Sequence, residues 1–346
     1  MAEARDVVTL TVGGRRFEAW KTVSVAKGIA DVAGAFSLEY AERTSETSEP
    51  VRVRRGESCV VSVGGETVIT GWIDAATPDF DPENRTLRVE GRDKASDLVD
   101  CSALNTPGVW RGRTLIQIAT DLVKPFGLSI EAAADVGQPF RQFAIEQGET
   151  VWDAIERLAR FRGLLAVSTA EGGLRFIRPG QARAGFSLRQ GVELIAASAG
   201  HDGRDRFSTY VLKGQSAGDD EVNGVAAAGP RAEVTDPGVT RHRPLLIIAE
   251  EQATLSSLRD RAAWEASRRA AEGETADLTV QGWRDPTGAI WKADQLVRVV
   301  SSWLDIDAEM LIADVTFSLT PETGSTTVLR CVPPDAYRPE PPEAQA

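Results

Sequence analysis

Short β-rich segments joined by pairs of glycines dominate the first hundred residues of the sequence. Residues 7–12 and 15–20 flank Gly13-Gly14, and a second pair of such segments flanks Gly64-Gly65. Two glycines between strands are typical of hairpins, because glycine readily adopts the positive φ angles that tight turns require. No helical pattern intervenes, so residues 1–100 are predicted to form a first small β-barrel.

The middle of the chain has a different pattern. Residues 113–123 place apolar side chains at helical spacing. Residues 150–163 do the same, with Thr150 as a candidate N-cap and Asp153 three positions later. An apolar hairpin follows this second helix directly. Residues 101–185 are therefore predicted to form a small α+β domain.

The rest of the chain returns to strands around an insertion. The predicted second β-barrel is split between residues 186–215 and 276–332. Residues 216–275 are predicted to form an inserted loop and helix. The tail, residues 333–346, is rich in proline and is predicted to be disordered. The expected fold class is mainly β with α+β parts.

The insertion contains one long helical pattern, from Leu255 to Glu272, ended by Gly273. A helix on a globular protein buries one apolar stripe. The positions expected to face the interior of the subunit are Leu255, Leu258, Ala262 and Trp264.

A weak internal repeat links the two predicted barrels. Each contains a strand, a turn, a second strand, a polar loop and a third strand, in that order. The first set spans residues 59–63, 68–74 and 86–90, and the second spans residues 296–300, 310–317 and 326–331. The shared order predicts two similar barrels in one subunit.

Length and charge narrow the class of protein. One hydrophobic core rarely grows beyond about 250 to 300 residues, so a chain of 346 residues is expected to have two or more domains. The formal net charge is −12, and tight binding of duplex DNA usually needs a basic face, so no specific nucleic-acid binding is expected. The start of the sequence does not resemble a signal peptide, and no apolar run approaches about 18 residues. Synthesis in the cytoplasm without membrane insertion is therefore expected.

The residues that most often carry catalysis are few and scattered. A nucleophile needs a base held beside it, and the only two histidines, His201 and His242, lie in polar stretches that favour surface positions. The cysteines are far apart and odd in number, which favours buried reduced thiols over a disulfide framework or zinc site. They are Cys59, Cys101 and Cys331.

Two carboxylate clusters are candidates for metal sites. One is Asp219-Asp220-Glu221, in a Gly-rich stretch, and the other is Asp305, Asp307 and Glu309. The first is expected to be solvated, and the second lacks the glycine turn and the distant bidentate glutamate of a calcium loop. We therefore expect no enzyme activity and no catalytic, cofactor-binding or metal-binding residues.

One segment supports an alternative function. Residues 146–163 resemble the opening of a LysM module, in which a G-[DE]-T-[LV]-W run starts the first helix. The alternative is a peptidoglycan-binding module or a tail-associated lysin. A LysM module continues into a second helix, whereas this chain enters an apolar hairpin. A capped helix packed by Trp152 is therefore the preferred interpretation.

Several runs resemble the Mu P family of baseplate hub proteins. In that family a strand ends in a G-R-[SD] turn and leads into a D-L-V-D-C-S segment, as Gly91-Arg92-Asp93 does here. The Gly91 backbone is expected to adopt a conformation costly for other residues. The matching runs, in family order, are residues 71–74 with 89–102, 147–165, 261–270 with 279–283 and 288–291, and 311–315 with 332–336.

The resemblance implies a structural hub subunit of a contractile phage or prophage tail, related in fold to the hub of T-even phages and to the N-terminal part of VgrG spikes. It implies a homotrimeric ring in which two similar barrels per subunit surround a DNA channel. Such a ring would join the sixfold tail tube to the threefold central spike. Other baseplate proteins would be its further partners, and the virion its location.

Overall fold

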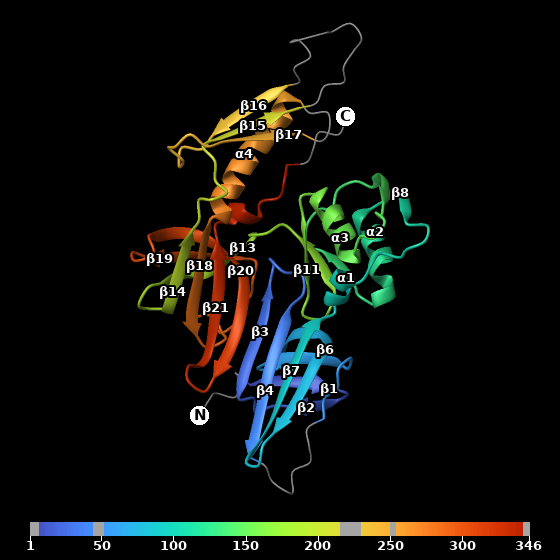
Figure 1. Cartoon of the computed structure of the whole chain (residues 1–346), viewed down its shortest axis with the longest axis vertical. Coiled ribbons are helices and arrows are strands. Elements are labelled where there is room, and N and C mark those ends of the chain that lie inside the picture. The colour runs from blue at the N-terminus through green and yellow to red at the C-terminus, as the bar shows by residue number, and fades with distance from the viewer. Residues whose placement is uncertain (1–6, 44–51, 215–229, 250–253, 342–346) are drawn as a thin grey trace. The chain divides into compact units, whose positions relative to one another are not determined.

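The computed structural model shows the chain as two compact units, which are described one at a time (Figure 1). Unit 1 consists of Met1–Ala197 and Asp277–Cys331, and unit 2 of Ser198–Ala276 and Val332–Ala346. The residues described are 7–43, 52–214, 230–249 and 254–341.

A first set of strands in unit 1 comes from the N-terminal part of the chain. These strands are β1 (Val8–Val12), β2 (Arg15–Phe17), β3 (Thr22–Gly28), β4 (Ala35–Arg43), β5 (Ser58–Val63), β6 (Glu66–Phe80) and β7 (Asn84–Asp93). Their hydrogen-bonded order is β3-β4-β7-β6-β5-β1-β2. Both predicted Gly-Gly hairpins are confirmed, since β1 pairs with β2 and β5 pairs with β6.

A second set of strands follows the helical part of the chain. These strands are β13 (Ala182–Arg189), β14 (Leu194–His201), β18 (Glu274–Gln281), β19 (Gln295–Ser301), β20 (Ile306–Thr320) and β21 (Gly324–Val332). Their order is β14-β18-β21-β20-β19-β13. Strands β14 and β18 continue across the boundary into unit 2.

The two sets share one strand order. Six strands of the first set correspond, in chain order, to the six strands of the second. The pairs are β1 with β13, β3 with β14, β4 with β18, β5 with β19, β6 with β20 and β7 with β21. Strands that are neighbours in one set are neighbours in the other. The strand order of the predicted repeat is thus confirmed. One pairing differs, because β1 is antiparallel to β5 whereas β13 is parallel to β19.

The sets are joined through β20, whose N-terminal half pairs with β19 of its own set and whose C-terminal half pairs with β3 of the other set. Strand β20 pairs with β3, with Phe317 opposite Val25, so the strands form one continuous 13-stranded sheet. Among the described residues, the first and last strands of each set do not pair with each other. Neither set is therefore the closed barrel that the sequence predicted. Strand β15 (Thr209–Lys213), expected in the second barrel, lies instead in a sheet of unit 2. Its backbone pairs with two strands of the insertion.

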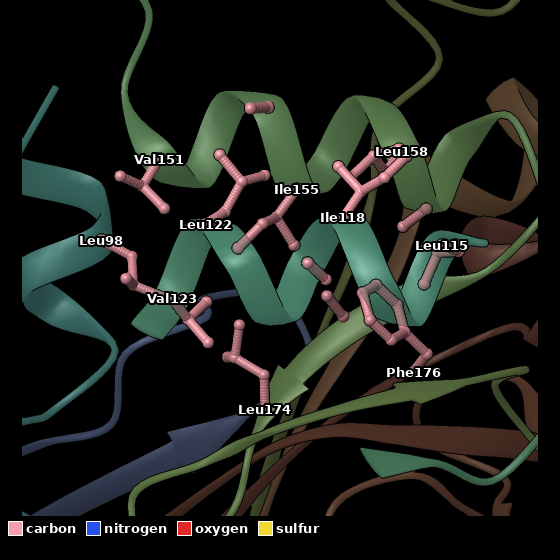
Figure 2. Close-up of a cluster of buried hydrophobic side chains, with 14 of the residues drawn as sticks. Leu98, Leu115, Ile118, Leu122, Val123, Val151, Ile155, Leu158, Leu174 and Phe176 are labelled. Atoms are coloured by element: carbon pink, nitrogen blue, oxygen red, sulfur yellow. The ribbon is translucent and has the colours of Figure 1, made fainter. Parts of the chain in front are cut away.

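An α+β layer lies between the two sets in sequence. Helices α2 and α3 pack on each other and on β12, which contributes Leu174 and Phe176 to their shared core (Figure 2). The elements are α1 (Ser96–Asp100), β8 (Val109–Arg113), α2 (Leu115–Val123), η1 (Lys124–Phe126), β9 (Ile130–Ala132), β10 (Phe140–Ala144), α3 (Val151–Arg160), β11 (Leu165–Ser168) and β12 (Leu174–Ile177).

Local sequence signals position both long helices of this layer. Thr150 accepts a hydrogen bond from the Asp153 backbone, and the Asp153 carboxylate accepts one from the Thr150 backbone, which completes the predicted capping box. Thr114 and Gln117 form the same arrangement at α2. Gly163, three residues beyond α3, has a φ of 60°, the left-handed conformation that commonly ends a helix.

Unit 2 packs one helix on a small sheet. Strands β16 (Arg231–Thr235) and β17 (Pro244–Ile248) flank β15, and α4 (Leu255–Glu272) covers one face. The helix bounds match the prediction, and Leu258, Ala262 and Trp264 are buried as expected. Leu255 is exposed instead, because it is the first residue of the helix.

Part of the C-terminal tail is ordered, contrary to expectation. A short helix, η3 (Pro334–Tyr337), packs on α4. The Trp264 indole Nε1 donates a hydrogen bond to the Arg338 carbonyl at 2.8 Å, and Arg261 pairs with Glu340 at 3.1 Å. Proline in the tail does not prevent this docking, since buried indole and paired charges offset the ordering entropy. Residues 342–346 lie outside the described part.

Candidate assembly surface

The residues most suggestive of chemistry do not come together. No group of three or more His, Cys, Asp or Glu that could hold a metal ion occurs in the described ranges. His201 is exposed and contacts Glu274, and His242 is also exposed. No helix in these ranges is long and apolar enough to cross a membrane.

Two of the three cysteines are buried as expected. Burial raises the pKa of the Cys59 thiol to about 12 and raises that of Cys331 further, so both are inert neutral thiols near pH 7. Cys101 is exposed, which corrects the expectation of a buried thiol. It directly follows α1, whose buried positions are Ser96 and Leu98.

Two of the three described carboxylates of these candidate metal clusters form ion pairs. Asp307 pairs with Arg298 at 2.7 Å, and Glu309 pairs with Arg183. Asp305 has a φ of 55° in the turn before β20. Residues 219–221 lie outside the described ranges.

The Gly91-Arg92-Asp93 motif is structural in each of its residues. A Cβ on Gly91 would lie 2.2 Å from the Trp72 carbonyl oxygen and 2.6 Å from the Phe36 ring. Its φ is not in the left-handed region, so close packing, not an unusual backbone angle, requires glycine here. Arg92 bonds Asp74 and Asp100, each at 2.8 Å, which ties β7 to β6 and α1.

Asp93 holds the chain where β7 turns into α1. Its carboxylate accepts hydrogen bonds from the Gly34 nitrogen at 2.8 Å and the Ala95 nitrogen at 3.0 Å. Burial raises the pKa of Asp93, while these bonds and the nearby Lys27 oppose the rise. Burial also lowers the pKa of Lys27, which lines a cavity of about 490 Å³ in unit 1.

Exposed aromatic side chains mark two hairpin ends of the large sheet. Trp303 lies between β19 and β20 and is 85% exposed, and Phe80 ends β6 and is 80% exposed. Tryptophan is enriched among the residues that contribute most to binding at protein interfaces, which makes Trp303 the stronger candidate of the two. The sequence pattern did not predict a functional role for either residue. For Trp303, the feature that could have indicated one is the position of a tryptophan in a polar connection between two predicted strands.

Family models cover most of the chain. Residues 7–93 match the "Mu phage baseplate assembly protein GpP-like, N-terminal" model, and residues 95–178 match "Baseplate hub protein gp44-like, second domain". Residues 254–340 match "Mu phage baseplate assembly protein GpP, fourth domain". The duplicated sheet and these matches define the class of the molecule as a phage baseplate protein.

The chain belongs to the family of the Mu phage baseplate hub protein. It is 33% identical over 340 residues to the baseplate hub protein gp44 of Escherichia phage Mu, covering 96% of this chain and 89% of that protein. It is therefore a baseplate hub protein of a Mu-like tail, a structural component and not an enzyme.

Solved structures agree with this family. The 43 kDa tail protein of prophage MuSo2 from Shewanella oneidensis is 36% identical, with a TM-score of 0.87 over 97% of this chain and all of that chain. The tail protein from Neisseria meningitidis MC58 is 25% identical, with a TM-score of 0.80 over 96% and 98% of the two chains. The E. coli c3393 protein, a type VI secretion component, shares the fold at 10% identity and a TM-score of 0.55, over 94% and 76% of the two chains.

Proposed function

We propose that this hub protein forms a homotrimeric ring that joins the sixfold tail tube to the threefold central spike and surrounds a channel for DNA. The observation that carries the proposal is the duplicated strand order in unit 1. Three subunits with two matching strand sets each present six similar backbone surfaces. Such a ring can meet a sixfold tube and a threefold spike at once.

The direction of the strands supports six equivalent positions. From β20 to β6 the sheet passes through β3, β4 and β7 by four successive antiparallel pairings. An even number of reversals leaves β20 and β6 running in the same direction. Both strand sets therefore present corresponding ends to the same side of the sheet, as a sixfold partner requires.

The charge of the chain fits a passage for DNA. With a formal net charge of −12, the protein lacks the excess of basic residues that attracts a polyanion through counterion release. We assign the hub no catalytic, cofactor-binding or metal-binding residues. The proposed partners of the hub are the spike, the tube and other baseplate proteins. The hub is proposed to be synthesised in the cytoplasm of a bacterial host and assembled into the tail there.

The peptidoglycan-binding alternative is less well supported. The helix that resembled a LysM opening is α3, and residues 95–178 around it match the second domain of a baseplate hub protein. In unit 1, α3 leads into the β11–β12 hairpin rather than a second helix. Val151, Ile155 and Leu158 are buried in the core shared with α2.

Multi-angle light scattering on the purified chain tests the proposal. The expected mass is three times 37.2 kDa at micromolar concentration. A monomer under these conditions would refute the ring. Incubation with purified sacculi tests the alternative, and saturable binding that Trp152→Ala abolishes would favour a peptidoglycan module.

A further inference from the structure

We infer that the end of the duplicated sheet that carries Trp303 binds the threefold spike, and that the opposite end faces the sixfold tube. The inference rests on the proposed hub function and assigns its two faces. It comes from comparing the hairpin loops of the two strand sets at each end of the sheet.

At one end of the sheet the two sets have matching loops. The β6–β7 connection is residues 81–83 and the β20–β21 connection is residues 321–323, so both have three residues. The strands that lead into them, β6 and β20, have 15 residues each. Six similar backbone loops per trimer suit a partner with six equivalent subunits.

At the other end of the sheet the loops differ. Gly64-Gly65 alone connects β5 to β6, whereas residues 302–305 connect β19 to β20 and include Trp303. The two glycines offer no side chains for a partner to bind. A contact made through the longer loop therefore occurs three times per trimer and suits a threefold partner.

The loop that carries Trp303 is held in place by hydrogen bonds of the buried Ser301 and the exposed Gln190. The Ser301 hydroxyl donates to the Gln190 side-chain oxygen at 2.8 Å and accepts from the Leu304 nitrogen at 3.2 Å. The Gln190 nitrogen bonds the Val300 carbonyl at 3.0 Å. A tryptophan on a preorganised loop loses little conformational entropy on binding, which favours it as an anchor.

The surroundings of Trp303 are suited to an apolar partner. Val192, in the neighbouring loop that contains Gln190, is 64% exposed. The charged residues that flank these two loops are paired, since Arg189 bonds Glu193 at 2.7 Å and Arg298 bonds Asp307 at 2.7 Å, whereas Asp305 lies in the same loop as Trp303. One carboxylate beside Trp303 and Val192 makes no strongly charged surface, so the partner is expected to present an apolar pocket for the indole rather than a charged groove.

Lateral pairing indicates that the occupant is the spike and not a second copy of this chain. The two strand sets join side by side through β20 and β3. A ring that repeats this arrangement also joins its copies at the lateral edges of the sheet. Hairpin loops lie at strand ends, so Trp303 is presented to a protein stacked on the ring.

The probe for the test is the purified central spike protein of the same phage tail, which is the partner named in the proposed function. Its affinity for the full-length hub is measured by biolayer interferometry. Trp303→Ala is expected to weaken binding by about 30-fold or more, as for other buried tryptophan anchors. Trp303→Phe should recover part of the loss. Phe80→Ala, at the opposite end, is the matched control and should leave the affinity within about twofold.

A second variant keeps the hairpin but removes the anchor. Replacing residues 302–305 by Gly-Gly copies the turn of the first strand set, and Ser301 and Ile306 already face each other across the hairpin. The variant should remain folded and trimeric and should not bind the spike.

The outcomes separate this inference from the hub proposal. A wild-type chain that forms no trimer or binds no spike refutes both. Spike binding that survives Trp303→Ala but is lost in Phe80→Ala reverses the two faces and overturns the inference alone. Loss of the trimer in Trp303→Ala would show that a second copy covers the tryptophan, which also overturns it.

Discussion

Glycine is required at position 91 because of close packing, although the φ angle of Gly91 is one that other residues adopt readily. A single added carbon would approach the Trp72 carbonyl oxygen to 2.2 Å, closer than atoms pack without a shift of the backbone. We expect Gly91→Ala to lower the free energy of unfolding by about 2 kcal/mol, a typical value for overpacking. Urea denaturation followed by tryptophan fluorescence measures this loss.

Gly185 provides the control for that substitution. It also lies within a strand of unit 1, but a Cβ there would meet no atom within 4 Å. Gly185→Ala should therefore leave the stability nearly unchanged. Equal losses in both variants would mean that general strand effects, and not the contact with Trp72, explain the result.

Asp93 should make stability depend on pH. Because burial raises the pKa of Asp93 in the folded state above the ordinary value of 3.8, folding favours its protonated form. The stabilisation from this group is therefore fully present below its unfolded pKa and is lost as the pH rises through the folded pKa. Asp93→Asn removes this titration, so the stability of the wild type relative to the variant should fall as the pH rises from about 4 through the raised folded-state pKa of Asp93.

Thermal unfolding of both proteins across this pH range measures the effect. The difference cancels contributions from other buried carboxylates, such as Asp294 and Asp314, which both proteins share. A difference that stayed constant, or grew with pH, would contradict the assignment of a raised pKa to Asp93.

At the scale of elements, the contact between η3 and α4 should stabilise unit 2. Deleting residues 333–346 removes the acceptor of the Trp264 indole and uncovers its ring. We expect the free energy of unfolding of unit 2 to fall by about 2 kcal/mol, from the lost burial and hydrogen bond. Urea titration of the truncated chain provides the measurement.

A shorter deletion isolates the contribution of the described tail. Removing only residues 342–346 retains the bond between Trp264 and Arg338 and the pair between Arg261 and Glu340. This variant should unfold like the wild type. If the long deletion also did so, the docked tail would have no role in stability.

For the molecule as a whole, the acidic charge predicts weak interaction with DNA. The anisotropy of a labelled duplex should not change on titration with the chain, even at about 50 mM salt, where electrostatic binding is strong. Saturable binding that weakened steeply with added salt would show a basic surface. It would also contradict the proposal that DNA passes through the ring without being held.

The sequence by itself determined the features that depend on neighbouring residues. The Gly-Gly hairpins, the capping box of Thr150 and Asp153, and the bounds of α4 all follow from patterns within a few positions. The order of strands in the repeat was visible as well, because the three strands that define it follow one another along the chain in each copy, β5, β6 and β7 in the first and β19, β20 and β21 in the second. Motif resemblance added the family, which the relatives confirm.

Only the tertiary structure decided which distant segments meet. The pairing of β20 with β3 joins residues nearly 300 positions apart and makes one sheet where two closed barrels were expected. Contacts between distant segments also place β15 in the sheet of unit 2 and dock the proline-rich tail on α4. The tertiary structure likewise decides that Trp303 is exposed. These outcomes depend on the free energy of contacts between surfaces that exist only after the local elements have formed, and a local sequence pattern does not encode them.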